Sequence, residues 1–393
     1  MNILIISAVF PPEPVVSANL SRDLAEELSK NNQLTVLCPK PTRPNGFIMN
    51  NNFEPDNYKV VRLNSFTCPS SDLLGRFRES FSFGRYCQNY IEANHDKIDI
   101  IYANTWPFFA QYFTVSTSKK FNIPLIIHVH DIYPESFSNK IPALKTLLNF
   151  ILLPIDKFLL NNATKIIAIS KKMKNYLMNT RKISGDKIFI VQNWQDENNF
   201  MKFKLQGKLD IVDKPFTFMY LGNIGPVAGV NLLLESFFNA NLKNCRLVIA
   251  GSGSMKEILK KKALELKLDT IEFWDVPDGK VPEIQNQADV MLLPIKKGSA
   301  LSSIPSKLPA YMFSEKPIIG CMDKESDTAK AIIEANCGWI LPPENPELLS
   351  RLMCEVSSLS NRELKNKGYK GFNYAINNYS KKRNLVKLVN LFK

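Results

Sequence analysis

Hydrophobic positions in the first half of the chain alternate between short continuous runs and helical spacing. Residues 3–7 form an apolar run of the kind that is buried on both faces of a parallel sheet. Leu20, Leu24 and Leu28 then recur on one face of a helix predicted over 17–30. Similar apolar runs follow at 33–38, 98–102, 125–129 and 166–169. Strands that alternate with helices predict βαβ units on a parallel sheet.

The second half repeats the pattern after a polar stretch, 196–215, which we interpret as an interdomain linker. Its predicted strands are 216–221, 246–250, 271–273, 290–294 and 317–319. We therefore predict an α/β protein of two doubly wound, Rossmann-like domains facing a cleft. The N-terminal domain would span 1–200 and the C-terminal domain 201–378; the family resemblance described below implies acceptor binding by the first and nucleotide-sugar binding by the second. A closing helix at 379–393 is expected to pack back toward the first domain.

Composition narrows the class of protein. A chain of 393 residues with 45% apolar and 22% charged residues is long enough for two folded domains. Seven scattered cysteines without a CxxC motif favour free thiols in a reducing compartment, and the first residues lack a signal-peptide pattern, so we expect a cytoplasmic protein. The net charge of +13 favours phosphate-bearing substrates or anionic lipid. Nucleic acid is not an expected partner, because no basic stripe is interleaved with aromatic residues.

Two segments of the second half suit phosphate binding. Gly222, Asn223 and Gly225 follow a predicted strand, where glycines let backbone N–H groups approach a diphosphate. A simple turn explains these glycines equally well. Residues 302–308 offer small hydroxyl residues, a proline and Lys307 at a helix start, where one lysine supplies a point charge for a leaving diphosphate. The alternative is a capped surface helix with a solvated lysine.

A third segment, residues 128–136, ends a strand of the first domain. His128 and His130 would share one side of that strand, but no other His or Cys lies near in sequence, so no metal site is expected. His130 beside Asp131 suits a polar group that holds a sugar hydroxyl. A buried structural histidine remains the alternative.

The order and spacing of short motifs resemble a known family. The motifs are Phe10–Glu13, His130–Ser136, Ile169–Ser170, Lys187 with Val191–Asn193, Gly222–Gly225, Ala250–Gly253, Ala288–Val290 with Leu293–Pro294, and Pro305–Leu308 with Lys316–Pro317. Together they resemble the retaining glycosyltransferases of family 4, close to the branch that builds colanic-acid, capsule and O-antigen repeat units. The resemblance covers nearly the whole chain.

This resemblance implies a GT-B fold and a metal-independent, cofactor-free transferase that binds its donor mainly through the second domain. His130 and Asp131 would meet the transferred sugar, with Lys307 as the third catalytic residue, and Asn193 would lie near the hinge. The donor site implied by the resemblance comprises Gly222, Asn223, Gly225, Gly251, Trp274, Asp275, Val276, Pro277, Ser303, Pro305, Ser306 and Lys307.

The chain departs from the family pattern at three places. Paired glutamates of the family fall at Ser302 and Ala310, and the Arg and Lys of its first phosphate loop fall at Asn223 and Ala228. The usual N-terminal glycine pair is replaced around 15–17. These losses weaken the donor contacts that the resemblance implies.

The acceptor implied by the resemblance is a saccharide on a polyprenyl diphosphate. Residues 73–86 and 141–160 mix aromatic or aliphatic residues with Lys and Arg, a pattern that binds anionic interfaces but also suits core helices with ordinary exposed charges. We therefore predict transfer of a hexose or N-acetylhexosamine from a UDP-sugar to a lipid-linked saccharide, with peripheral membrane contact. The rival hypotheses are a catalytically silent nucleotide-sugar-binding subunit and a GT-B-shaped sugar-nucleotide epimerase.

Overall fold

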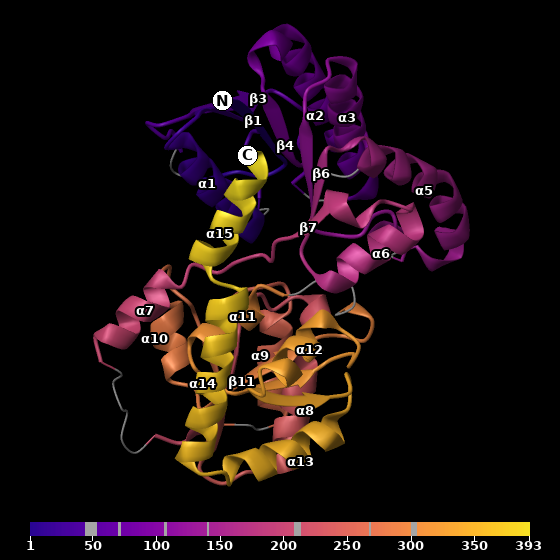
Figure 1. Ribbon diagram of the computed structural model, residues 1–393. Coiled ribbons are helices and arrows are strands. Elements are labelled where there is room, and N and C mark those ends of the chain that lie inside the picture. Colours follow the sequence, from indigo (N-terminus) through magenta and orange to yellow (C-terminus); the bar gives the residue numbers. More distant parts are fainter. Residues whose placement is uncertain are drawn as a thin grey trace. The chain divides into compact units, whose positions relative to one another are not determined.

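The computed structural model describes residues 1–43, 53–69, 72–105, 108–139, 141–207, 214–266, 269–299 and 305–393. These residues form two compact units (Figure 1). Unit 1 comprises residues 1–193 and 384–393, and unit 2 comprises residues 194–383. Each unit is built on its own parallel sheet, as the alternation of strands and helices predicts.

Unit 1 has a seven-stranded sheet in the order β3-β2-β1-β4-β5-β6-β7, with every pair of neighbours parallel. The strands are β1 (Asn2–Ser7), β2 (Gln33–Pro39), β3 (Lys59–Leu63), β4 (Ile100–Asn104), β5 (Leu125–Val129), β6 (Lys165–Ala168) and β7 (Ile188–Ile190). The α-helices are α1 (Val16–Ser29), α2 (Leu73–Asn94), α3 (Phe109–Lys120), α4 (Glu135–Ser138), α5 (Lys145–Asn162) and α6 (Lys171–Arg181).

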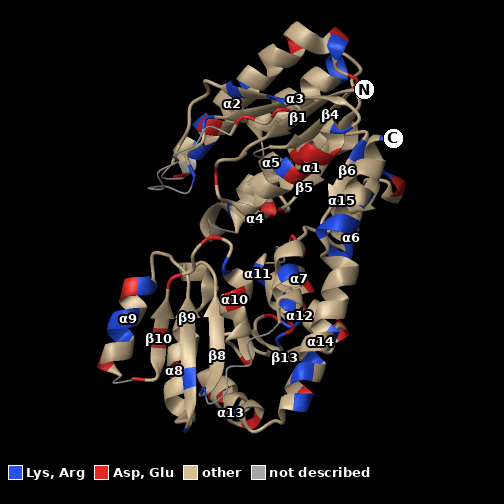
Figure 2. Cartoon of the chain, turned by 90° about the vertical axis from the view of Figure 1, so that its left-hand side faces the viewer, with Lys and Arg blue, Asp and Glu red and all other residues tan. Residues whose placement is uncertain are grey.

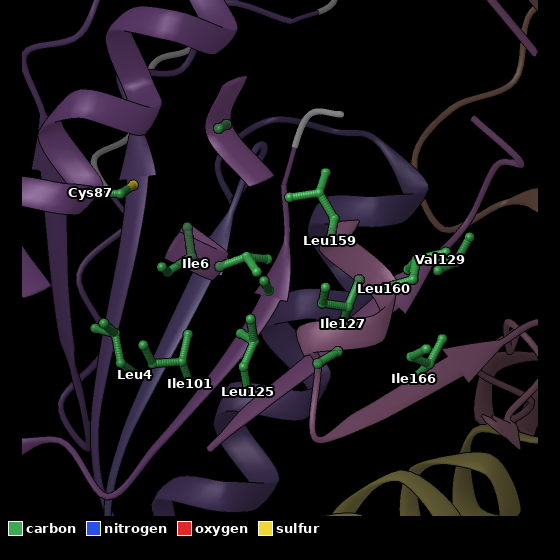
Figure 3. Close-up of a cluster of buried hydrophobic side chains, with 14 of the residues drawn as sticks. Leu4, Ile6, Cys87, Ile101, Leu125, Ile127, Val129, Leu159, Leu160 and Ile166 are labelled. Atoms are coloured by element: carbon green, nitrogen blue, oxygen red, sulfur yellow. The ribbon is translucent and has the colours of Figure 1, made fainter. Parts of the chain in front are cut away.

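The core of unit 1 lies between its sheet and the helices, as Figure 3 shows for ten labelled side chains. Leu4 and Ile6 point into this core together with Leu125 and Ile127 of β5. All five residues of β5 are buried, which explains its unbroken apolar sequence. Because both faces of the sheet are covered, polar side chains of unit 1 that act on a ligand must stand beyond the strand ends.

Unit 2 has a six-stranded parallel sheet in the order β10-β9-β8-β11-β12-β13. The strands are β8 (Phe216–Leu221), β9 (Cys245–Ala250), β10 (Ile271–Trp274), β11 (Val290–Pro294), β12 (Ile318–Cys321) and β13 (Gly338–Leu341). The α-helices are α7 (Asn198–Leu205), α8 (Asn231–Ala240), α9 (Lys256–Glu265), α10 (Val281–Asn286), α11 (Lys307–Phe313), α12 (Asp327–Glu334), α13 (Pro346–Ser357) and α14 (Asn361–Asn378). Helix α15 (Lys381–Val389) carries the chain from unit 2 back into unit 1.

Successive side chains of β8 pack alternately into two separate hydrophobic cores of unit 2. Phe218 and Tyr220 belong to one buried cluster, whereas Met219 and Leu221 belong to the cluster on the opposite face. This alternation follows from the two-residue repeat of a strand whose faces are both covered. It also fixes the direction in which the chain leaves the sheet at Gly222.

In both sheets the order in which successive strands are added reverses at the first strand. In unit 1, β1 lies between β2 and β4; in unit 2, β8 lies between β9 and β11. Crossovers therefore run to opposite sides, and the loops at the carboxyl ends of these strands separate. Ligands of doubly wound sheets bind at such switch points.

Some elements differ from the prediction. The stretch 196–215, predicted as a linker, contains α7, which belongs to unit 2. Strands β3, β7 and β13 were not predicted; none of the three has more than five residues.

The C-terminal residues pack on unit 1. Lys165 Nζ donates a hydrogen bond to the Leu391 carbonyl at 2.6 Å. The rings of Phe392 and Tyr102 lie 6.0 Å apart, and Phe392 is buried. The last ten residues are thus part of unit 1 rather than a free tail.

Replacing Gly84 by alanine tests the packing of α2 on α3. A Cβ at Gly84 would lie 2.7 Å from Phe113 Cδ2 and 2.8 Å from Ala110 Cα. Although alanine favours helices, we expect G84A to lower the free energy of unfolding by about 1–3 kcal/mol because α3 must move. Urea denaturation measures this, with the exposed Asn89→Ala in the same helix as a control that should be nearly neutral. Equal stability of the two variants would contradict the packing.

Candidate functional site

The carboxyl ends of β8, β9 and β10 in unit 2 lie close together because glycines follow β8 and β9. Gly222 N–H donates to the Ala250 carbonyl at 3.0 Å, and Gly251 N–H donates to the Trp274 carbonyl at 3.0 Å. Gly222 and Gly251 have φ values of 153° and 128°, which L-residues with a Cβ rarely adopt. A Cβ on Gly251 would lie 2.2 Å from the Gly222 carbonyl oxygen. Both positions therefore require glycine.

Lys307 lies over this glycine contact. A Cβ at Gly222 would lie 2.0 Å from Lys307 Cε, so the lysine stem occupies the space that a side chain would fill. Its ammonium group is 5.3 Å from the centre of the Tyr220 ring. Burial lowers the pKa of Lys307 from its usual value, and no ion pair to Lys307 is found within the described part of the chain. Such a group favours the arrival of an anion.

Two tyrosines fix the backbone beside Lys307. Tyr311 OH donates to the Leu221 carbonyl at 2.8 Å and accepts from Leu221 N–H at 3.0 Å. Tyr220 OH donates to the Asn223 carbonyl at 2.6 Å. Burial raises the pKa of both phenols, so both remain protonated donors at neutral pH. The position of the loop that starts at Gly222 thus depends on hydrogen bonds from buried side chains.

Other residues of the predicted donor site lie in this loop or in the segment before α11. Asn223 Oδ1 approaches Gly253 so closely that a Cβ there would lie 2.7 Å away, and Gly225 precedes a 3₁₀ turn at Pro226–Ala228. Ser306 is exposed and its side chain makes no capping hydrogen bond to α11, contrary to the predicted capping role. Pro305 is half-buried before it, and Ser303 lies outside the described residues.

The segment after β10 is held to the glycine loops by Lys256. Lys256 Nζ donates to the Gly251 carbonyl at 2.9 Å and to Asp275 Oδ1 at 2.6 Å. This contact lowers the pKa of Asp275. Val276 packs against the unit 2 core, and the Pro277 carbonyl accepts from Lys280 N–H at 3.1 Å. Base recognition by residues 274–277 stays a prediction.

Unit 1 contains a cavity of about 650 Å³ at the carboxyl ends of its strands. Ala8 follows β1, Asn104 and Thr105 end β4, and His128 and His130 lie on or after β5, so all reach the cavity at the switch point. Arginines and aromatic residues form other parts of the wall. The lining residues also include Arg43, Arg76, Phe77, Asp131, Tyr133 and Phe137.

The two histidines stack on each other in this cavity. Their ring centres are 4.1 Å apart, and the hydroxyl of Tyr102 lies 2.6 Å from His128 Nδ1. Burial holds the pKa of His128 well below its usual value and lowers that of His130 to about 4, although a hydrogen bond with Asn193 acts in the opposite direction. Both imidazoles are therefore neutral at pH 7, and each keeps a buried Nε2 without a hydrogen-bond partner. Asp131 is exposed and lines the same cavity.

A buried ion network, which sequence reasoning missed, braces the loop after His130. Arg181 is fully buried and donates to both carboxylate oxygens of Glu135 at 2.6 Å, to Asp156 at 2.8 Å and to the Tyr133 carbonyl at 2.6 Å. Burial raises the pKa of Asp156 to about 6, although Arg181 opposes that shift. In the sequence, Arg181 looks like an ordinary cation at a helix C-terminus, so nothing marked it.

A second buried carboxylate organises the opposite wall. Glu79 is 1% exposed and binds the guanidinium groups of Arg43 and Arg76. Glu13 accepts hydrogen bonds from the backbone of Phe10, Thr42 and Arg43 at 3.0–3.1 Å. Glu13 belongs to a recognised motif, whereas the pairing of Arg43 with α2 depends on contacts distant in sequence.

The structure therefore gathers the predicted residues into two groups. Lys307, Gly222, Asn223 and Gly251 meet at the strand ends of unit 2. His130 and Asp131 line the cavity of unit 1. Two doubly wound units, each with polar groups at its switch point, are typical of proteins that bind nucleotides or sugars there.

Two family models match the chain, one in each half. Residues 17–198 match the family model described as Glycosyltransferase Family 4, and residues 201–371 match the one described as Glycosyl transferases group 1. Each half of the chain is thus similar to one of these two glycosyltransferase domain families.

Two curated relatives are each 25% identical to this chain. The probable glycosyltransferase WbjE of Pseudomonas aeruginosa aligns over 253 residues, 60% of either chain. The putative colanic acid biosynthesis glycosyl transferase WcaI of Escherichia coli (strain K12) aligns over 156 residues, 38% of either chain. The chain thus matches less than two thirds of the length of these relatives.

The fold is also that of solved proteins. The crystal structure of Anabaena HepE in complex with UDP and glucose superposes with a TM-score of 0.69 at 15% identity, covering 100% of this chain and 99% of that chain. The predicted GT-B fold is confirmed by the two parallel-sheet units and this likeness.

The low pKa of His130 predicts how stability depends on pH. Between about pH 4 and 6.5 the unfolded histidine binds a proton that the folded one does not, so stability must fall as the pH falls through this window. His130→Gln removes this dependence for one group, by at most about 1.4 kcal/mol per pH unit. Urea denaturation of both proteins from pH 7 to 4.5 measures the two slopes. Parallel slopes would contradict a neutral, half-buried His130.

Proposed function

We propose that this protein transfers a hexose or N-acetylhexosamine from a nucleotide-sugar, UDP-linked, to a lipid-linked saccharide in surface polysaccharide biosynthesis. The two family matches support the glycosyltransferase activity, and the similarity to WcaI, named for colanic acid biosynthesis, supports the pathway class. The likeness to HepE, whose structure holds UDP and glucose, supports the donor. We place the reaction in the cytoplasm at the membrane surface, where a polyprenyl-diphosphate acceptor is accessible.

The observation that carries this proposal is the position of Lys307 over the Gly222 loop. A nucleoside diphosphate that leaves from the sugar develops charge on its β-phosphate oxygen. A half-buried ammonium group next to backbone that no side chain covers stabilises such charge strongly, because water screens it little. Lys307, with backbone at Asn223 and Ser306, would thus act on the leaving diphosphate without a metal ion.

Unit 1 would supply the sugar side of the reaction. A neutral His130 can donate to or accept from a sugar hydroxyl, and Asp131 beside it adds a carboxylate acceptor. His128, fixed by Tyr102, supports His130 by stacking. We propose a retaining outcome on the ground of the family resemblance.

A second candidate function has one specific observation in its favour. Ala310, where the resembled family carries a glutamate, is 8% exposed and belongs to a core cluster of unit 2. A donor site without that carboxylate suits a silent nucleotide-sugar-binding subunit. Such a protein would bind the nucleotide and release none.

Lys307→Ala tests the proposed function. We expect the variant to lose about 10²–10³-fold in kcat/KM, since it lacks a cation aimed at the departing charge. Purified protein is incubated with UDP-, GDP- and dTDP-sugars and bacterial membrane lipid, and free nucleoside diphosphate and lipid-linked sugar are measured. Lys280→Ala is the matched control, because Lys280 is exposed and pairs with Glu283.

The outcomes separate the rival functions. Acceptor-dependent release that the Lys307 variant loses and the Lys280 variant keeps supports the transferase. Tight binding of a nucleotide-sugar without release from any donor supports the silent subunit. Conversion of the donor to a second nucleotide-linked sugar without acceptor would identify an epimerase.

A further inference from the structure

Helix α5 of unit 1 exposes a continuous apolar stripe. Phe150 is 79% exposed, and Leu147 and Ile151 are more than half exposed. Phe158 lies two turns further along the same side and is also exposed. The opposite side buries Leu152, Asp156, Leu159 and Leu160 against the sheet. A helix that is apolar on its outer side as well as its inner side leaves hydrophobic surface in water.

The stripe continues onto two neighbouring helices. The Phe158 ring lies 6.2 Å from that of Tyr112 on α3, and Tyr112 contacts Phe113, whose ring lies 5.3 Å from that of Phe81 on α2. Tyr112 and Phe81 are both exposed by more than 40%. We call Phe81, Tyr112, Leu147, Phe150, Ile151 and Phe158 the aromatic face. One face thus spans α2, α3 and α5.

Cationic side chains contact aromatic rings in and next to the aromatic face. Lys119 Nζ lies 5.4 Å from the centre of the Phe158 ring, and Arg85 lies 5.4 Å from that of Phe113. Lys145 and Lys157 are exposed on α5 itself. Figure 2 colours the lysines and arginines of the chain blue.

The acidic residues of the three helices do not offset this charge. Glu79 and Asp156 are buried in ion pairs with arginines, and Glu92 pairs with Lys120 at 3.1 Å. Within the described parts of α2, α3 and α5, these are the acidic side chains. The exposed charge on these helices is therefore mainly positive. A hydrophobic face with a cationic border complements an anionic lipid surface.

Helix α2 connects this face with the cavity. Phe81 lies on its exposed side, whereas Arg76, Phe77 and Ser80 line the cavity. None of the described helices is long and apolar enough to cross a bilayer. A lipid acceptor could enter the cavity from a surface on which α2 itself rests.

We infer that the aromatic face of unit 1 docks the protein on the surface of an anionic bilayer. This inference rests on the proposed function, because it explains how a lipid-linked acceptor reaches the unit 1 cavity. Aromatic and aliphatic side chains enter the interface, while Lys119, Lys145 and Lys157 contact lipid headgroups. The attraction must therefore have an apolar part and a salt-sensitive part.

Vesicle sedimentation tests the docking surface. The full chain is mixed with vesicles of equal parts phosphatidylglycerol and phosphatidylcholine, and with phosphatidylcholine alone. We expect binding to the anionic vesicles that weakens with salt. The double variant Phe150→Glu/Phe158→Glu should bind at least tenfold more weakly, because both side chains would lose their place in the interface. Lys119→Gln/Lys157→Gln should lose roughly fivefold per lysine and part of the salt dependence, because Lys145 and Arg85 remain.

Leu205→Glu is the matched control. Leu205 is 84% exposed on α7 of unit 2 and has Lys202 and Lys204 beside it, so it shares the chemistry but not the location. The control should bind vesicles like the parent protein. An equal loss in the control, no binding by the parent protein, or a dimer that the double variant dissolves would each overturn the inference.

A second measurement separates this inference from the proposed transferase. UDP binding by calorimetry should be the same in the parent protein and the Phe150/Phe158 variant, which also shows that the variant is folded. Vesicle binding without UDP binding or sugar transfer would support the docking surface and contradict the proposed transferase activity. Sugar transfer without vesicle binding would contradict the docking surface and leave the transferase proposal unaffected.

Discussion

The backbone contact between Gly222 and Gly251 is the constraint on which the site of unit 2 depends. A Cβ at Gly251 would collide with the Gly222 backbone and separate the strand ends, whereas a Cβ at Gly222 would displace the stem of Lys307. Because the loops touch, the ammonium group of Lys307 lies where β8 ends. Hydrogen bonds from Tyr311 and Tyr220 then fix the loop. The loop backbone is therefore preorganised before any ligand binds.

The same sheet architecture explains the cavity of unit 1. Strands such as β5 are buried on both faces, so their polar chemistry is confined to the carboxyl end, where His128 is the last polar residue of the strand. Desolvation there keeps both imidazoles neutral. The buried pairs of Arg181 and Glu79 hold the loops that enclose them. The neutral imidazoles inside this wall can hydrogen-bond an uncharged polar group.

Much of this fold could be predicted from apolar runs alone. The predicted bounds of β8 and β11 match the structure, because long, fully buried strands leave unbroken apolar sequence. Strand β13 was not found this way, because it begins with Gly338, a residue type that is rare in strands. Lys307 was identifiable from its place at a helix start. Arg181 and Tyr311 were not, because their partners lie 46 and 90 residues away.

The cations of this chain differ in what offsets the cost of their burial. Arg181 is surrounded by two carboxylates, and Lys256 has Asp275 and two carbonyls, so both are satisfied within the fold. Lys307 has an aromatic ring and, among the described residues, no ion pair. A desolvated ammonium group without a counter-ion lowers stability. A ligand that supplies the missing anion would offset this cost, and we therefore propose that the unpaired lysine, rather than the net charge, marks the site of an anionic ligand.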